Sequence, residues 1–145
     1  MSGLLNERPQ FFYMFHHRGT EVPSTGRSSD IIAAAIEVHR RLGPGLLESA
    51  YEACLCREMC FRRIPFDSQV EVPLYYRGMR VDCGYRLDIV AFGSVLVEVK
   101  AVSKILPIHR AQVLTYLRTT GLRLGLLINF NVEVLRVGIH RLING

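Results

Sequence analysis

The chain has 145 residues, a length that fits one domain with a buried core and is too short for two. Hydrophobic residues make up 49% of the chain and charged residues 21%, which excludes disordered and fibrous proteins. No apolar run approaches the roughly 18 residues of a membrane span, and Glu7 and Arg8 interrupt the stretch where a secretory signal would need an apolar core. We therefore expect a cytoplasmic protein.

The net charge of +5 is unevenly distributed. From Lys100 to the C-terminus the only acid is Glu133, and it accompanies a larger set of cations: Lys100, Lys104, Arg110, Arg118, Arg123, Arg136 and Arg141. A basic C-terminal third suits a polyanion such as nucleic acid. An ordinary solvated surface would leave the same pattern.

Four cysteines require an explanation: Cys54, Cys56, Cys60 and Cys83. A reducing cytoplasm argues against disulfides. A four-thiolate metal site is conceivable, but C-x-x-C pairs, which usually mark such sites, are absent. Buried or incidental thiols are the favoured interpretation.

Residues 1–27 resemble a loosely ordered extension, with clustered aromatics followed by Pro, Gly, Ser and Thr. We expect one ordered domain over residues 28–145. Its first helix should begin at Ser28, Ser29 or Asp30 as a cap and end at Gly43-Pro44-Gly45.

A second helix is expected over residues 46–63. Glu48, Tyr51 and Leu55 share a stripe at i, i+3 and i+7, which places the Glu48 carboxylate at the margin of the buried face. Glutamate in a first helical turn also interacts favourably with the helix dipole, so capping alone could explain it.

Beyond Pro65 the hydrophobic period changes to two, which indicates strands. We expect a strand up to a turn at Arg77-Gly78, a second strand over 79–91 and a third over 95–102. A helix from Pro107 to Gly121 should follow, then an apolar central strand and a final strand or hairpin. The order α-α-β-β-β-α-β-β predicts an α/β fold in which helices flank one mixed sheet.

The turn Phe92-Gly93-Ser94 sets the register of two of these strands. A loop of three residues pairs Ala91 with Val95 and places Asp88 directly opposite Glu98, whereas a loop of two would put them on opposite faces.

Two facing carboxylates repel unless a positive charge lies between them. Lys100 shares their face of the sheet. A divalent cation held by two carboxylates, with room left for water and phosphate oxygens, is a typical magnesium arrangement. Such a cation activates water, and a neighbouring lysine can orient it, which is chemistry for phosphodiester cleavage. A surface cluster of salt bridges is the alternative interpretation.

The ordered motifs GLLESAY, GYRLDIV, VEVKAV, AQVLTYL and GLRLGLLINFNV resemble the GxxExxY protein family, a branch of the PD-(D/E)xK nuclease superfamily with the restriction-endonuclease-like fold. The resemblance runs from about Ile31 to Gly145. Leu87 stands where the name of the superfamily has proline.

The resemblance implies that Asp88, Glu98 and the main-chain carbonyl of Val99 bind Mg²⁺ or Mn²⁺. It also implies that Lys100 acts on the water or the phosphate. Glu48 would complete the metal shell from its helix.

Gln112 and Tyr116 match a motif that contacts substrate in related nucleases. His109, one turn before Gln112, is a further candidate for phosphate contact. Tyr51 is a candidate for a substrate contact, and core packing explains it equally well. His39 could reach the same cleft, although a histidine satisfied within the fold is the favoured interpretation.

The expected activity is hydrolysis of nucleic acid, with DNA favoured over RNA. The alternative is a catalytically silent module that keeps the nuclease fold and binds nucleic acid or a protein. A nuclease of one domain that cuts both strands often dimerises, so a homodimer is a further expectation, although no sequence feature marks its interface.

Overall fold

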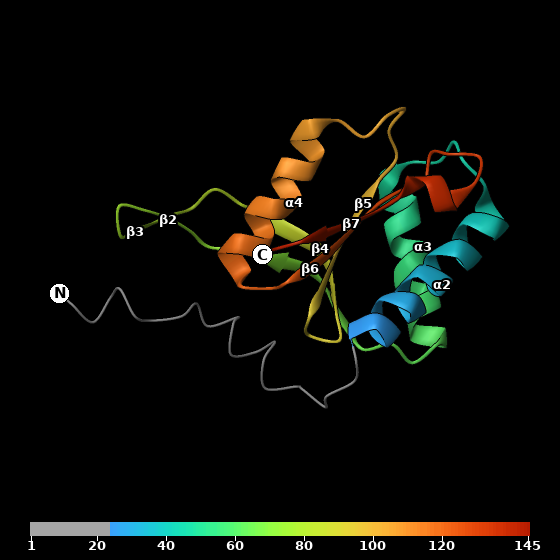
Figure 1. Ribbon diagram of the computed structural model, residues 1–145, viewed down its shortest axis with the longest axis horizontal. Helices are drawn as coiled ribbons and strands as arrows, with labels where there is room; N and C mark the ends of the chain where they lie inside the picture. The colour runs from blue at the N-terminus through green and yellow to red at the C-terminus, as the bar shows by residue number, and fades with distance from the viewer. Residues whose placement is uncertain (1–23) are drawn as a thin grey trace.

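A computed structural model describes residues 24–145, so most of the expected N-terminal extension lies outside the described residues. Two helices, α2 (Ser24–Leu42) and α3 (Glu48–Phe61), pack together on one side of a sheet, and α4 (Pro107–Thr120) lies on the other side (Figure 1). No helix within residues 24–145 combines the length and the apolar character needed to cross a membrane.

The main sheet has five strands in the order β1-β4-β5-β6-β7. Their bounds are β1 (Phe66–Glu71), β4 (Arg86–Ala91), β5 (Val95–Lys100), β6 (Leu124–Asn129) and β7 (Ile139–Ile143). Strands β5 and β6 are parallel, and the other neighbours are antiparallel. Helix α4 makes the crossover that parallel neighbours require. The predicted α/β fold with a mixed sheet between helices is confirmed.

The two long strands expected around the Arg77-Gly78 turn are each broken in the structure. The turn is present, but it joins β2 (Leu74–Tyr76) to β3 (Met79–Val81), which form a separate two-stranded sheet. Val72 N still donates to Tyr85 O at 2.9 Å. Pro73 then has no N–H to offer, so the ladder of the main sheet stops there. The β2–β3 hairpin projects away from the body of the domain (Figure 1).

Helix α2 begins at Ser24, ahead of the expected cap at Ser28. Ser28 is fully buried inside the helix, and Arg141 Nη2 donates to its hydroxyl at 2.9 Å. The serine therefore anchors β7 to α2, and the expectation that it caps the helix is wrong. The bounds of α4 match the prediction, with Gly121 in the left-handed conformation at its C-terminus.

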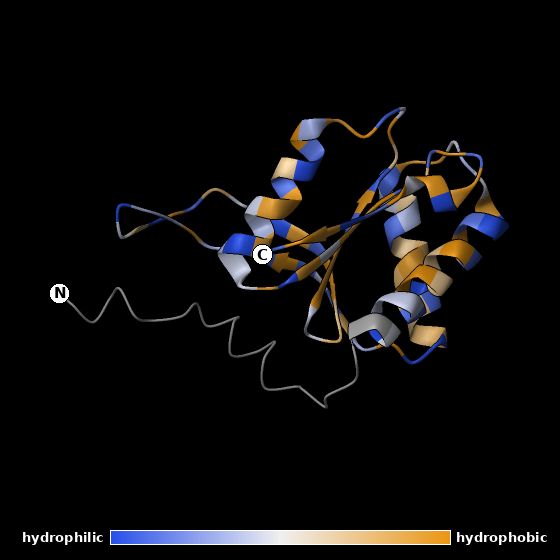
Figure 2. Ribbon diagram, in the orientation of Figure 1, coloured by the Kyte–Doolittle hydropathy of each residue, from blue (hydrophilic) through white to orange (hydrophobic). Residues whose placement is uncertain are grey.

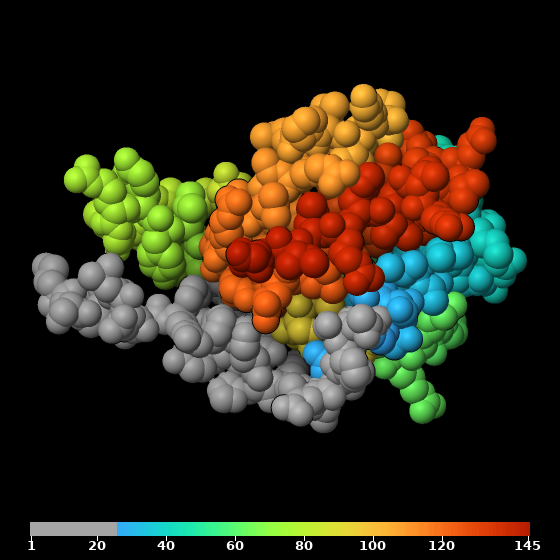
Figure 3. Space-filling view, in the orientation of Figure 1, coloured from blue at the N-terminus to red at the C-terminus, as the bar shows by residue number. Residues whose placement is uncertain are grey.

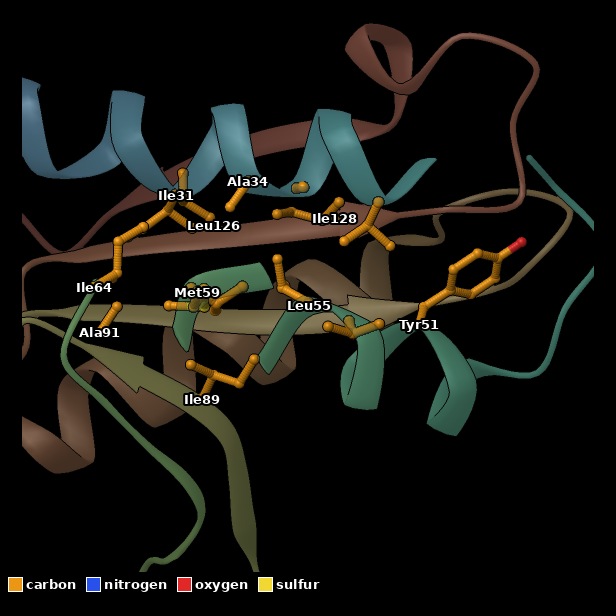
Figure 4. Close-up of a cluster of buried hydrophobic side chains, with 14 of the residues drawn as sticks. Ile31, Ala34, Tyr51, Leu55, Met59, Ile64, Ile89, Ala91, Leu126 and Ile128 are labelled. Carbon is orange, nitrogen blue, oxygen red and sulfur yellow. The ribbon is translucent and has the colours of Figure 1, made fainter. Parts of the chain in front are cut away.

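The chain between β6 and β7 includes a short 3₁₀ helix, η2 (Leu135–Gly138), where the sequence predicts only a strand or hairpin. The central strands β4, β5 and β6 are predominantly apolar (Figure 2), which lets the sheet carry a core on each face. One core lies against α2 and α3 and includes Ile89, Val97 and Leu126 (Figure 4). The other lies against α4 and includes Val90, Leu96 and Leu127. Alternate residues of one strand thus face opposite cores.

Candidate active site

The register of the β4–β5 hairpin is the one that the three-residue turn predicts. Ala91 pairs with Val95, Val90 with Leu96 and Ile89 with Val97. Ser94 N donates to Ala91 O at 3.0 Å and closes the turn. The next pair along this register is Asp88 and Glu98, so the two carboxylates come from opposing positions on neighbouring strands.

At this pair, side chains take over the hydrogen bonds between the strands. Asp88 N donates to Glu98 Oε1 at 3.0 Å, and Val99 N donates to Asp88 Oδ2 at 2.8 Å. Each carboxylate therefore accepts an N–H from the opposite strand. The exchange fixes the positions of both acids, because each is bound to main chain rather than to a mobile side chain.

Burial and mutual repulsion dominate the electrostatics of the pair. The Glu98 side chain is nearly buried, with 5% exposed, whereas Asp88 is half-buried. Burial, and then the charge of Asp88, raise the pKa of Glu98 well above its ordinary value, and Lys100 acts in the opposite direction. Two anionic oxygen donors held together with too little positive charge suit a hard divalent cation.

The strand around Lys100 is held on its far side by β6. Lys100 pairs with Asn129, and Phe130 N donates to Lys100 O at 2.8 Å. Because Lys100 O points toward β6 and successive residues of a strand point their main-chain groups to opposite sides, the Val99 carbonyl faces β4. That is also the direction in which Val99 N meets Asp88.

The buried side chain of Asn129 holds the segment after β5. Its Oδ1 accepts from Val102 N at 3.0 Å, and its Nδ2 donates to Val102 O at 2.8 Å. A third bond runs from Asn131 N to the same Oδ1 at 3.2 Å. The chain on either side of Lys100 is thus fixed, which restricts where its ammonium group can lie.

Helix α3 brings two acids to this side of the domain. Glu48 is the first residue of the helix and is exposed. Glu52 follows one turn later on the same helix face and accepts a hydrogen bond from Gln69 Nε2. Burial raises the pKa of Glu52, and the charges of Asp88 and Glu48 add to this effect. Glu52 therefore lies within electrostatic reach of the acidic pair.

The structure does not gather the helix acids and the strand acids into one cluster. Within residues 24–145, no group of three or more His, Cys, Asp or Glu side chains has the arrangement of a metal site. The donors that lie together are the two strand carboxylates, next to a main-chain carbonyl. A place for Glu48 in a metal shell stays a prediction.

Tyr51 has a structural role. Its ring is fully buried and stacks on Phe130, with 4.8 Å between ring centroids. Its hydroxyl donates to Gly43 O at 2.6 Å and accepts from Leu46 N at 3.1 Å. Figure 4 shows this hydroxyl at the end of the core. These bonds tie down the turn in which Gly45 has a φ of 102°, so Tyr51 fixes how α3 starts.

Helix α4 presents Gln112 and Tyr116 near the acidic pair. Gln112 Nε2 donates to the Tyr116 hydroxyl at 3.1 Å. Burial and the charge of Glu98 raise the pKa of Tyr116, which indicates that this hydroxyl lies near the carboxylates. His109 Nδ1 accepts from Leu106 N at 2.9 Å at the helix start, and the opposite edge of its ring remains for other contacts.

Two residues of this region were not identified from the sequence. Glu52 could have been found from its i, i+4 spacing to Glu48, which predicts a shared helix face. Asn129 gave no local signal, because its role depends on Val102, in a distant part of the chain. His39 Nε2 lies 2.7 Å from Val132 O, an arrangement that agrees with a satisfied histidine.

The four cysteines are not joined in disulfides, and Cys56 lies within electrostatic reach of Glu52 and Asp88. All four are free, with Cys60 and Cys83 exposed. Burial, followed by the charges of Glu52 and other nearby groups, raises the pKa of Cys56 to about 11, which keeps this thiol protonated at neutral pH.

Comparison with known proteins identifies one family. A profile described as the PD-(D/E)XK nuclease superfamily matches residues 26–142, which is most of the chain. No curated protein and no solved structure gives a significant match.

Proposed function

The chain belongs to the PD-(D/E)XK nuclease superfamily, and on that premise we propose that it is a metal-dependent nuclease that hydrolyses phosphodiester bonds in nucleic acid, DNA in preference to RNA. One observation carries the proposal. The Asp88 and Glu98 carboxylates lie together, each accepting a main-chain hydrogen bond from the opposite strand, and Lys100 follows Glu98 by two residues on the same strand. The narrower assignment to the GxxExxY branch stays a prediction from the sequence.

Asp88, Glu98 and the Val99 carbonyl are the proposed ligands of Mg²⁺ or Mn²⁺. The donors fit such an ion, since all are oxygens and the charge of Lys100 does not offset the burial and repulsion that raise the pKa of Glu98. When bound, the ion would supply Lewis acidity and a water of lowered pKa. Glu48 is proposed to complete the shell from α3, and Glu52 adds negative charge beside Asp88.

Lys100 is the proposed catalytic cation. It shares a strand face with Glu98, so its ammonium group can orient water or stabilise the negative charge that develops on the phosphate. Gln112, Tyr116 and His109 are the proposed substrate contacts, because they lie along the side of α4 that adjoins the carboxylates. Tyr51 contributes by positioning the start of α3 rather than by touching substrate.

The test is nicking of plasmid and single-stranded DNA in buffers containing Mg²⁺ or Mn²⁺. The Lys100→Ala variant should lose cleavage about 100-fold or more, the effect typical of removing a group that stabilises developing charge. Lys104→Ala is the matched control, because Lys104 is exposed and lies beyond the end of β5. It should keep at least about half of the activity.

Wild-type protein that binds DNA but never cuts it, in either metal ion, would contradict the nuclease proposal and favour a silent binding module. Equal cleavage by wild type and Lys100→Ala would contradict the role given to Lys100.

A further inference from the structure

A pocket of about 470 Å³ lies between α4 and the base of the β2–β3 hairpin. One wall includes Pro73, Leu74 and Tyr85, and the opposite wall includes Ile108, Gln112 and Tyr116. In Figure 3 the hairpin forms a yellow-green lobe that projects beside the orange surface of α4. The volume lies within the range of pockets that bind small molecules or parts of larger ligands.

The pocket has the character of a site for a flat aromatic group. Its lining is mainly apolar and carries two tyrosine rings, Tyr85 and Tyr116, with centroids 6.1 Å apart and an edge-to-face angle of 67°. Tyr116 is buried, whereas 44% of Tyr85 is exposed, so Tyr85 is the more accessible of the two rings to a ligand. Gln112 uses one amide hydrogen on Tyr116 and retains an oxygen and a second hydrogen for a polar edge.

The α4 side of the pocket is basic, whereas the hairpin side carries both signs of charge, with Glu71 and Asp82 near Arg80. No Asp or Glu occurs between Lys100 and Asn131, and α4 carries exposed Arg110 and Arg118. Arg77 lies at the hairpin turn. An aromatic pocket next to a basic, acid-free segment suits a ligand that joins flat rings to negative charges, which describes a nucleic acid strand.

The pocket adjoins the proposed active site. Tyr116 is shared between them, since it lines the pocket and interacts electrostatically with Glu98 and Asp88. Tyr85 lies three residues before Asp88, a separation of about 10 Å along an extended chain. A base in the pocket would therefore belong to a nucleotide close to the cleaved phosphate.

We propose that this pocket binds an unpaired nucleobase beside the scissile phosphate, and that single-stranded nucleic acid is consequently the preferred substrate. The inference rests on the proposed nuclease function. A base within a duplex is stacked and paired, and it reaches such a pocket only after leaving the stack at an energetic cost. Single strands do not incur that cost.

The test measures binding in EDTA, where metal-dependent cleavage is suppressed, with fluorescently labelled 12-nucleotide single strands and the matching duplex. DNA and RNA strands are measured separately, because stacking of a base on an aromatic ring does not distinguish DNA from RNA. The single strand should bind about tenfold more tightly than the duplex in at least one arm.

Tyr85→Ala should weaken single-strand binding about tenfold, as expected for loss of one stacking partner, and Tyr85→Phe should restore it. Thr115→Trp, from an exposed position on α4 that lines the pocket, should weaken binding by filling the space while leaving Tyr85 intact. Tyr76→Ala is the control, because Tyr76 is an exposed tyrosine of the same hairpin outside the pocket lining. It should change affinity less than about twofold.

Equal affinity for single strand and duplex, or unchanged binding by Tyr85→Ala and Thr115→Trp, would overturn the inference. A concentration-dependent dimer that Tyr85→Ala abolishes would also overturn it, since the pocket would then hold a second copy.

Cleavage assays separate the pocket inference from the nuclease proposal. If duplex DNA is cut in a Lys100-dependent manner without any effect of Tyr85, the nuclease proposal stands and the pocket inference fails. If single-strand binding depends on Tyr85 but no metal ion supports cleavage, the pocket binds a base as inferred and the nuclease proposal fails.

Discussion

The β4–β5 hairpin is built differently at its two ends. At the closed end, Ala91 and Val95 are buried and main-chain bonds alone join the strands around the turn. At the open end, the side chains of Asp88 and Glu98 accept hydrogen bonds from main-chain N–H groups, and the strands carry two carboxyl groups instead of two apolar groups. The same hairpin is thus core at one end and candidate site at the other.

The difference shows where this fold gives up stability. Burying apolar side chains at the closed end is favourable, whereas a buried carboxylate beside a second one carries a desolvation cost that their hydrogen bonds only partly offset. A costly arrangement is expected where a sequence serves function as well as folding. Substitutions that disturb the packing near the open end, or that remove its buried carboxylate, therefore test this difference in stability between the two ends of the hairpin.

The largest loss of stability should come from Gly138→Ala. A Cβ at this position would lie 2.2 Å from Asn129 O, and Asn129 holds the chain beyond Lys100. Main chain cannot move aside cheaply, so we expect the free energy of unfolding to fall by about 3 kcal/mol. Urea denaturation measures this.

The control for this substitution is Gly145→Ala, where a Cβ meets nothing within 4 Å. Equal stability of the two variants would show that η2 and β6 do not pack as described, and would weaken the role given to Asn129 in holding the open end.

A gain in stability is expected from Glu98→Gln in metal-free buffer. Glutamine keeps an oxygen that can accept from Asp88 N and removes the buried charge. At pH 8 the free energy of unfolding should rise by about 2 kcal/mol, on the order of the penalty for an uncompensated buried ion.

The pH dependence checks the cause of that gain. The pKa of Glu98 is raised in the folded chain above its ordinary value of 4.5, so its contribution to stability is fully present below pH 4.5 and is lost as pH rises through the folded pKa. The advantage of Glu98→Gln should therefore appear as pH rises and vanish at pH 4. An advantage that is the same at pH 4 and pH 8 would contradict this explanation.

A smaller effect is expected from Tyr51→Phe. The ring and its stacking on Phe130 remain, but the bonds of the hydroxyl to Gly43 O and Leu46 N are lost. Thermal or urea denaturation should show a loss of about 1 kcal/mol. Tyr76→Phe, at an exposed position, should change stability by much less. Matching losses in the two variants would mean that the Tyr51 hydroxyl does not hold the turn.

Local chemistry explains what the sequence could predict. The three-residue turn at Phe92-Gly93-Ser94 fixes the pairing of Ala91 with Val95, and that pairing alone places Asp88 against Glu98. Pro107 and Gly121 mark the ends of α4 in the same direct way.

Contacts between distant segments explain what the sequence could not predict. Arg141 donates a hydrogen bond to Ser28 inside α2, and no residue near Ser28 in the sequence predicts this contact. The approach of Glu52 to Asp88 depends on how α3 lies over the sheet. The pocket lined by Tyr85 lies where the ladder stops at Pro73 and the β2–β3 hairpin leaves the main sheet, which the local sequence does not predict.

Calorimetric titration with Mg²⁺ and Mn²⁺ tests most directly whether the open end of the hairpin is a metal site. Wild-type protein should bind the ion, Asp88→Ala should lose the heat of binding, and Asp82→Ala should retain it, because the Asp82 side chain is almost fully exposed on the chain after β3. No detectable binding by the wild type, or equal binding by wild type and Asp88→Ala, would contradict the assignment of Asp88 and Glu98 as metal ligands.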